Sequence, residues 1–241
     1  METHVTAQHF IDYILNERHA TRADLAIGED VILTYAGLPQ NIADWDLEPP
    51  KLSIFPRPVL SDGRITIIRG PVGAPHVASV IEELNALGAR RIWVLGYAGS
   101  LTDLFHLGDV ALIDRAWSDE GTSRHYGAFG WGHANPNLLA KLQPYLHKTP
   151  AAICSTDAIY RETAAKLAAF RSQGAALIDM ETSCYFHVGA ALGLQVAALM
   201  VVSDELTHGW RPGFVSDAVI KGAQAAWQVI WQAIRQGAVR P

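Results

Sequence analysis

The chain has 241 residues, 49% of them apolar, and carries a formal net charge of −5 at pH 7. This is enough apolar material for one substantial core, and no run of Lys or Arg supplies the basic surface that binding to a nucleic acid polymer requires. The longest apolar stretch, residues 196–202, is far shorter than the ~20 residues that span a bilayer, so we expect no membrane partner.

Six apolar runs predict buried strands, at residues 30–36, 65–68, 92–95, 110–113, 151–154 and 196–202. Helical patterns fall between them. Pro75 opens a helix whose apolar face continues to Gly88, and a wide apolar stripe follows from about residue 216. Strands that alternate with helices predict a single α/β domain in which helices flank a largely parallel sheet. Ligands collect at the carboxyl ends of the strands in such sheets, so the loops after strands are the candidate sites.

Two glycine-containing loops follow predicted strands. Residues 69–75 lead from a strand into a helix, whose free N–H groups could face an anion, although such turns also use glycine only for backbone shape. Residues 96–101, with Ala98 and Gly99, could let a flat ring or a sugar approach the backbone, or could be an ordinary tight turn. Neither loop alone indicates a function.

At two further predicted strand ends, an acid directly follows a Met or a Ser residue. Glu181 follows Met180 at a strand-to-helix junction, and Asp204 follows Ser203 at the end of an apolar strand. An ionised carboxylate is costly to bury without a partner, so acids at the rims of apolar strands are either satisfied structurally or functional. Glu181 and Asp204 are therefore the lead candidates for a site.

A further loop, after the strand at 151–154, places Ile159 and Tyr160 where they could form a wall for a base, although residues of these types are more often core. The segment 208–214 mixes aromatic and cationic groups with glycines. It could be a lid or a pocket wall, and a surface loop explains it nearly as well.

The order of these motifs resembles the nucleoside phosphorylase superfamily, which includes purine nucleoside phosphorylases, uridine phosphorylases and related nucleosidases. The resemblance covers about residues 65–236, and the ordered set is more specific than any single motif. The motifs are, in order, VGAPHVASVIEELNALGARRIWVLGYAGSL, LGDVALIDRAWSDEGTSRHY, STDAIYRE and DMETSCYFHVGAALGLQVAALMVVSDEL. It implies an α/β fold around a mixed, mostly parallel central sheet, assembled into homodimers or homohexamers, and cleavage of the N-glycosidic bond of a nucleoside.

By this resemblance, Glu181 accepts hydrogen bonds from the ribose hydroxyls and Met180 packs on the sugar. Asp204, steadied by Ser203, is the general acid that protonates a purine at N7. This is chemically reasonable, because the sugar gains oxocarbenium character while electrons move into the departing base. The uridine-selective members usually lack this aspartate, so the resemblance favours a purine.

The chain departs from the family where phosphate would bind. Phosphorolytic members carry an arginine at the position of Val94 and a Ser or Thr at the position of Tyr97, and the early GDP-x-R loop is missing. A phosphate dianion needs cations or a donor-rich helix terminus, which valine cannot replace. Arg69, beside the turn that holds Gly73, is the best-placed substitute.

We therefore expect an enzyme that cleaves the N-glycosidic bond of a purine nucleoside, with phosphate as co-substrate. A nucleosidase that uses water is a close alternative, although the first loop lacks the glutamate that hydrolytic members tend to carry. A non-catalytic nucleoside-binding homologue is a third.

No cofactor and no metal site is expected, since the ten histidines show no HExxH spacing and Cys154 and Cys184 lie 30 positions apart. Both cysteines suit reduced thiols, and the N-terminal residues lack a signal-peptide core, so we expect one cytoplasmic domain over residues 1–241.

Overall fold

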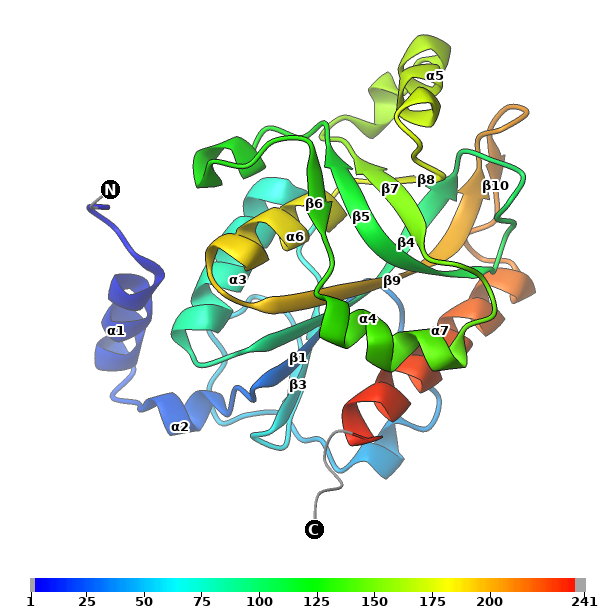
Figure 1. The fold of residues 1–241 in the computed structure, drawn as a ribbon. Helices are drawn as coiled ribbons and strands as arrows, with labels where there is room; N and C mark the ends of the chain where they lie inside the picture. The colour runs from blue at the N-terminus through cyan, green and yellow to red at the C-terminus, as the bar shows by residue number, and fades with distance from the viewer. Residues whose placement is uncertain (1–2, 237–241) are drawn as a thin grey trace.

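A computed structural model describes residues 3–236, which form one α/β unit with a ten-stranded mixed sheet (Figure 1). The strands are β1 (Asp30–Thr34), β2 (Val59–Ser61), β3 (Ile65–Arg69), β4 (Arg91–Ser100), β5 (Val110–Ser118), β6 (Trp131–His133), β7 (Ala151–Ser155), β8 (Leu177–Asp179), β9 (Gln195–Glu205) and β10 (Arg211–Pro212). The helices are α1 (Ala7–Glu17), α2 (Arg22–Leu25), α3 (Ala74–Ala86), α4 (Pro136–Leu142), α5 (Ala164–Ser172), α6 (Thr182–Ala191) and α7 (Asp217–Gln236), with short 3-10 helices η1 to η4 between them.

The sheet runs in the order β10-β9-β5-β7-β8-β4-β1-β3-β2, and β9 also pairs with β4. That second pairing closes β4, β9, β5, β7 and β8 into a barrel-like ring, from which β1, β3 and β2 extend as an open wing. The longest pairing, between β4 and β9, is parallel, and β1 is parallel to both of its neighbours. The predicted mixed, mostly parallel sheet is therefore confirmed.

Helices cover both faces of the sheet because its central strands are apolar on both sides. Val94 of β4 and Ala198 of β9 belong to a core with α3 and α6, whereas the adjacent residues Trp93 and Ala197 belong to a second core with α4 and α7. Successive side chains of a strand point to opposite faces, so one continuous apolar run supplies both cores. Figure 1 shows α3 and α6 together on one side and α4 and α7 on the other.

All six predicted strands and both predicted helices are present, but the prediction that residues 96–101 form a loop after a strand is wrong. β4 continues through Gly96 and Gly99 to Ser100 because these glycines leave room for side chains of the neighbouring segment. A Cβ atom at Gly96 would lie 2.6 Å from Met200 Sδ, and one at Gly99 would lie 2.6 Å from Leu206 Cδ1. Glycine serves here to pack β4 closely against β9, not to turn the chain.

Candidate active site

The junction between β8 and α6 is fixed by the buried carboxylate of Asp179. One oxygen accepts a hydrogen bond from Ser155 Oγ at 2.5 Å, and the other accepts from the hydroxyl of Thr182 and from its backbone N–H at 2.9 Å. The aspartate thus satisfies a free N–H at the start of α6. Burial nevertheless raises the pKa of Asp179 above its usual range. The hydrogen bonds of Asp179 fix the backbone on both sides of Glu181, the residue just before α6.

Glu181 faces a small cavity and a backbone donor. Its Oε1 accepts a hydrogen bond from the N–H of Gly73 at 2.7 Å, which ties the start of α3 to the start of α6. Burial, and then the adjacent Asp179, raises the pKa of Glu181 to about 8. The cavity has a volume of about 100 Å³ and is lined by Tyr35, Val94, Gly96, Tyr97, Asp179, Glu181 and Met200.

Asp204 lies near the end of β9, with both carboxylate oxygens occupied. Ser203 Oγ donates to Oδ1 at 2.8 Å, and the indole Nε1–H of Trp210 donates to Oδ2 at 3.1 Å. Ser203 and Trp210 thus bind the two oxygens of this carboxylate from different sides of the sequence. Glu162 lies near Asp204. Burial, and then the negative charge of Asp204, raise the pKa of Glu162 to about 7.

The two lead acids leave the sheet on opposite sides of β4. Gly99 of β4 pairs with Ile178 of β8 on one side and with Asp204 of β9 on the other. Glu181 follows β8 by two residues. β8 runs antiparallel to β4 and β9 runs parallel to it, so the two strands end in opposite directions, and the two acids are brought together through their shared neighbour Gly99. The missing side chain of Gly99 leaves room for its neighbours, since a Cβ there would lie 2.6 Å from Leu206 Cδ1, 3.2 Å from Ile178 Cγ2 and 3.3 Å from Asp204 Oδ2. Asp204 itself is not among the residues that line the small cavity beside Glu181.

The remaining predicted base-binding residues divide into two groups. Ala98 and Gly99 are buried in β4 beside Asp204. Ile159 and Tyr160 lie on η4 with 48% and 96% of their surface exposed. Their predicted role as a wall for a base stays a prediction.

The predicted anion ligands Arg69, Gly73 and Tyr97 belong to the end of β3, to the turn before α3 and to β4. The N–H of Gly73 already binds Glu181, and Arg69 is exposed at the end of β3. Burial raises the pKa of Tyr97, and the nearby positive charge of Arg69 partly offsets this. The cavity beside Tyr97 is lined by two carboxyl groups and by no cation.

Residues that sequence reasoning missed shape this cavity. Tyr35 donates its hydroxyl proton to the carbonyl of Pro71 at 2.5 Å, and its oxygen lies 3.0 Å from that of Tyr185. Burial raises the pKa of both phenols well above the usual range. Tyr35 directly follows β1, which ends at Thr34, so its position at a strand exit was the available signal.

A larger open cleft, of about 860 Å³, lies where β1, β3 and β4 begin. Its polar lining includes Asp30, whose carboxylate accepts from Arg91 Nε at 2.7 Å and from Trp93 Nε1 at 2.9 Å. None of the predicted site residues lines this cleft. It is therefore remote from the chemistry of the candidate site.

A second buried acid, Glu120, contacts α6, the helix that begins directly after Glu181. Its carboxylate accepts hydrogen bonds from Ser118 Oγ at 2.8 Å, from the N–H of Thr122 at 2.6 Å and from Ser183 Oγ of α6 at 3.1 Å. Burial would raise the pKa of Glu120, but the hydrogen bonds from Ser123 and these neighbours outweigh it and lower the pKa. The group is 1% exposed, and it connects the loop after β5 to α6.

Replacing Glu120 by glutamine is expected to destabilise the fold by about 2–3 kcal/mol, because donors arranged around a carboxylate then meet an amide that brings its own N–H groups. The lowered pKa gives the sign of the pH dependence. The stabilisation from Glu120 is complete above its unfolded pKa and is lost as the pH falls through the lower folded value. Urea unfolding of both proteins at pH 7 and pH 4 measures this, with the exposed Glu17→Gln as control. Equal stabilities at pH 7 would contradict the expected effect.

Within the described residues, no helix is long and apolar enough to cross a membrane.

Comparison with known sequences identifies relatives of this chain. A family model described as the phosphorylase superfamily matches residues 49–235. A guanosine phosphorylase of Halorubrum lacusprofundi is 27% identical over 162 residues, covering 64% of this chain and 66% of that protein. A DeoD-type purine nucleoside phosphorylase of Bacillus cereus is 23% identical over 154 residues, covering 61% of this chain and 66% of that protein. The chain thus matches less than two thirds of the length of these curated relatives.

Solved structures share the fold. A purine nucleoside phosphorylase from Toxoplasma gondii, in complex with immucillin-H, superposes with a TM-score of 0.76 at 20% identity and covers 98% of both chains. A uridine phosphorylase from Vibrio fischeri superposes with a TM-score of 0.71 at 24% identity, covering 87% of this chain and 93% of that chain. The neighbours differ in the base that their names specify, so fold likeness alone does not select a substrate.

Proposed function

The chain belongs to the phosphorylase superfamily, and on this basis we propose that it cleaves the N-glycosidic bond of a purine nucleoside and releases the free base. The observation that carries the proposal is the arrangement of Glu181 and Asp204 on either side of Gly99, which pairs with Asp204 of β9 and with Ile178 of β8, three residues before Glu181. In this proposal, the sugar of the nucleoside lies near Glu181 and its base lies near Asp204.

The proposed roles follow from where charge develops. As the bond between C1′ and the base nitrogen breaks, the sugar becomes oxocarbenium-like and the bonding electrons move into the base. Asp204 gives a proton to N7 of the purine, which neutralises the departing base. Glu181 accepts hydrogen bonds from the ribose hydroxyls, and Met180, partly buried beside it, packs on the sugar.

Phosphate is the proposed acceptor, which gives a sugar 1-phosphate as the second product. The names of the curated relatives, guanosine phosphorylase and purine nucleoside phosphorylase, support this choice. Arg69 is the proposed cation for the phosphate, with Tyr97 and the turn at Gly73 beside it. The whole chain, residues 1–241, is proposed to act as one cytoplasmic catalytic domain in a homodimer or homohexamer; residues 1–2 and 237–241 lie outside the described part.

Hydrolysis is the second candidate, because one observation favours it. The cavity beside Glu181 is lined by the carboxyl groups of Asp179 and Glu181 and by the apolar Val94, and no cation lines it. Such walls repel a dianion, whereas a water molecule can enter and bind a carboxylate.

The acceptor can be read directly from product formation. Inosine and adenosine are incubated with the protein with and without phosphate, and the free base and sugar 1-phosphate are quantified. Phosphorolysis predicts base release that requires phosphate, with one sugar 1-phosphate for each base. Equal base release without phosphate would replace phosphorolysis by hydrolysis, and no release under either condition would contradict the proposed function.

A further inference from the structure

Asp204 lies on a part of β9 that extends beyond the end of a neighbouring strand. Within the described residues, the pairing of β9 with β5 ends at Val201, and β9 then continues to Glu205 beside the two-residue strand β10. Pro212 of β10 lies opposite Asp204. Because proline has no backbone N–H, it cannot donate to the ladder at this position. The ladder is therefore short where it carries the candidate acid.

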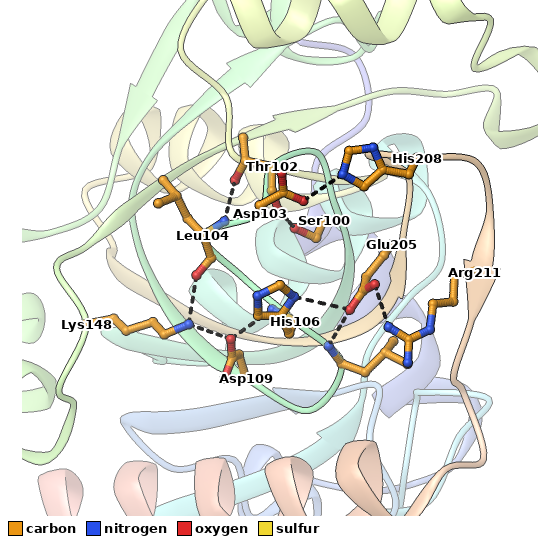
Figure 2. A network of polar contacts seen from close by, with 11 residues as sticks. Ser100, Thr102, Asp103, Leu104, His106, Asp109, Lys148, Glu205, His208 and Arg211 are labelled. Atoms are coloured by element: carbon orange, nitrogen blue, oxygen red, sulfur yellow. Dashed lines mark hydrogen bonds and ion pairs between the residues drawn. The ribbon is translucent and has the colours of Figure 1, made fainter.

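The next residue, Glu205, adds side-chain contacts to this short ladder. Its Oε2 accepts a hydrogen bond from Arg211 Nη1 at 2.9 Å, and its Oε1 accepts one from the backbone N–H of Leu107 at 3.1 Å. Figure 2 shows the carboxylate between Arg211 and His106, whose Nδ1 lies 3.5 Å from Oε1. One carboxylate thus joins the end of β9 to β10 and to the loop between β4 and β5.

These partners favour the charged form of Glu205. Burial tends to raise the pKa of Glu205, but the hydrogen bonds from Leu107 and Arg211 and the charges of Arg211 and His106 outweigh it and lower the pKa. The side chain of Glu205 is 16% exposed, whereas those of Arg211 and His106 are 68% and 64% exposed. The carboxylate is therefore the inner member of the cluster, and its side-chain partners reach it from the solvent side.

The loop between β4 and β5 is itself anchored, so it can serve as a fixed support. The backbone N–H of His106 donates to Asp109 Oδ2 at 2.8 Å. Lys148, from the segment before β7, donates to the same carboxylate and to the carbonyl of Leu104, the latter at 2.8 Å (Figure 2). Phe105 in this loop is buried in the core that contains α3 and α6. Glu205 thus ties the end of β9 to a segment that is held by several independent contacts.

The partners of Asp204, which are Ser203 and Trp210, differ from those of Glu205. Glu205 therefore acts on Asp204 through the backbone that the two residues share. We propose that Glu205 is a positioning residue: its carboxylate fixes the end of β9 so that Asp204 stays aligned with N7 of the base. This inference rests on the proposed function. A misplacement of about 1 Å is costly, because proton transfer requires hydrogen-bond distance between the acid and the base.

Replacing Glu205 by glutamine keeps the size of the side chain and breaks one of its contacts. The single amide oxygen can accept from Leu107 or from Arg211, while the NH₂ group meets the other donor. We expect kcat for hypoxanthine release from inosine, with phosphate present, to fall by about 10-fold and KM to stay within about 2-fold. Asp103→Asn is the matched control in the same network (Figure 2). Its pair with His208, at 3.3 Å, joins two largely exposed side chains, and such pairs contribute little.

A second substrate separates misplacement of the acid from general damage. The base of 7-methylinosine already carries a positive charge on its imidazole ring, so it leaves without a proton from Asp204. We expect Glu205→Gln to cleave this nucleoside with a kcat within about 2-fold of the wild type. Equal losses with both nucleosides, or an unchanged kcat with inosine, would overturn this inference and leave the proposed function standing. A wild-type protein that releases no base from either nucleoside would overturn both.

A second variant decides the question if circular dichroism shows that Glu205→Gln does not fold. Arg211→Met removes one partner of Glu205 from an exposed position, so the fold should persist. We expect its kcat for inosine to fall by about 3-fold while its kcat for 7-methylinosine stays at the wild-type value. If Arg211→Met cleaved inosine at the wild-type rate, or lost activity equally with both nucleosides, Glu205 would not position Asp204.

Discussion

Replacing Asp204 by asparagine is expected to lower kcat for base release from a purine nucleoside by about 10²-fold or more. Asparagine has nearly the same shape, and its oxygen can still accept a hydrogen bond from Ser203 or from Trp210. The fold and the pairing of β10 with β9 should therefore remain. What it lacks is a proton to give to the departing base. The purine then leaves with its negative charge uncompensated, and the barrier rises.

Comparison with a second aspartate makes this result specific. Asp44→Asn changes an exposed residue of η1, far from the strand ends that carry the site, and should leave kcat unchanged. Steady-state rates with inosine, followed by the free base formed, measure both variants. If Asp204→Asn retained wild-type kcat while binding nucleoside normally, Asp204 could not be the general acid. A substrate whose base leaves without protonation would recover most of the lost rate, and such recovery separates loss of the acid from general damage.

The sheet and its cores were predictable because the signal is local. An apolar run such as residues 196–202 must be buried on both faces, and this requires helices on both sides. The short strands were not predictable: β8 and β10 have three and two residues, too few to show a period. β4 was predicted too short because Gly96 and Gly99 usually indicate a turn, while their real cause, the packing of Met200 and Leu206, lies more than 100 residues away in the chain.

The candidate site was predictable in its acids and not in their surroundings. Glu181 and Asp204 stand at strand ends, and the topology brings strand ends together. The hydrogen bond between Trp210 and Asp204 depends on how the chain after β9 folds back, which the sequence from His208 to Trp210 does not specify. Asp179 carried a usable signal, because an aspartate three residues before Thr182 is a common way to satisfy a helix start. The walls of the cavity, in contrast, come from four separate segments of the chain.

Replacing Glu181 by glutamine is expected to produce two opposite effects, a loss of activity and a gain of stability at high pH. The loss should be about 10²-fold or more in kcat/KM, because the single oxygen of glutamine is already bound by the N–H of Gly73 and its NH₂ group cannot accept hydrogen bonds from the ribose hydroxyls. The backbone contact survives, since the glutamine oxygen can still accept from the N–H of Gly73.

The gain in stability follows from the raised pKa of Glu181, about 8 in the folded protein. An unfolded glutamate has a pKa near 4.3, so between about pH 4.3 and 8 the folded state holds a proton that the unfolded state has released. In that window the stability of the wild-type protein falls as the pH rises, and above pH 8 the full cost of a buried charge beside Asp179 is present. Glutamine carries no such proton and avoids this cost.

We therefore expect the Tm of Glu181→Gln to match that of the wild type near pH 5 and to exceed it by roughly 2–4 °C or more at pH 9. Thermal unfolding at several pH values measures the difference, and Glu17→Gln, which removes an exposed carboxylate, should show none. Parallel curves for Glu181→Gln and the wild type would mean that Glu181 is not held in a desolvated site. A more stable but inactive variant would instead show that the fold tolerates an unfavourable charge at this position because ribose binding requires it.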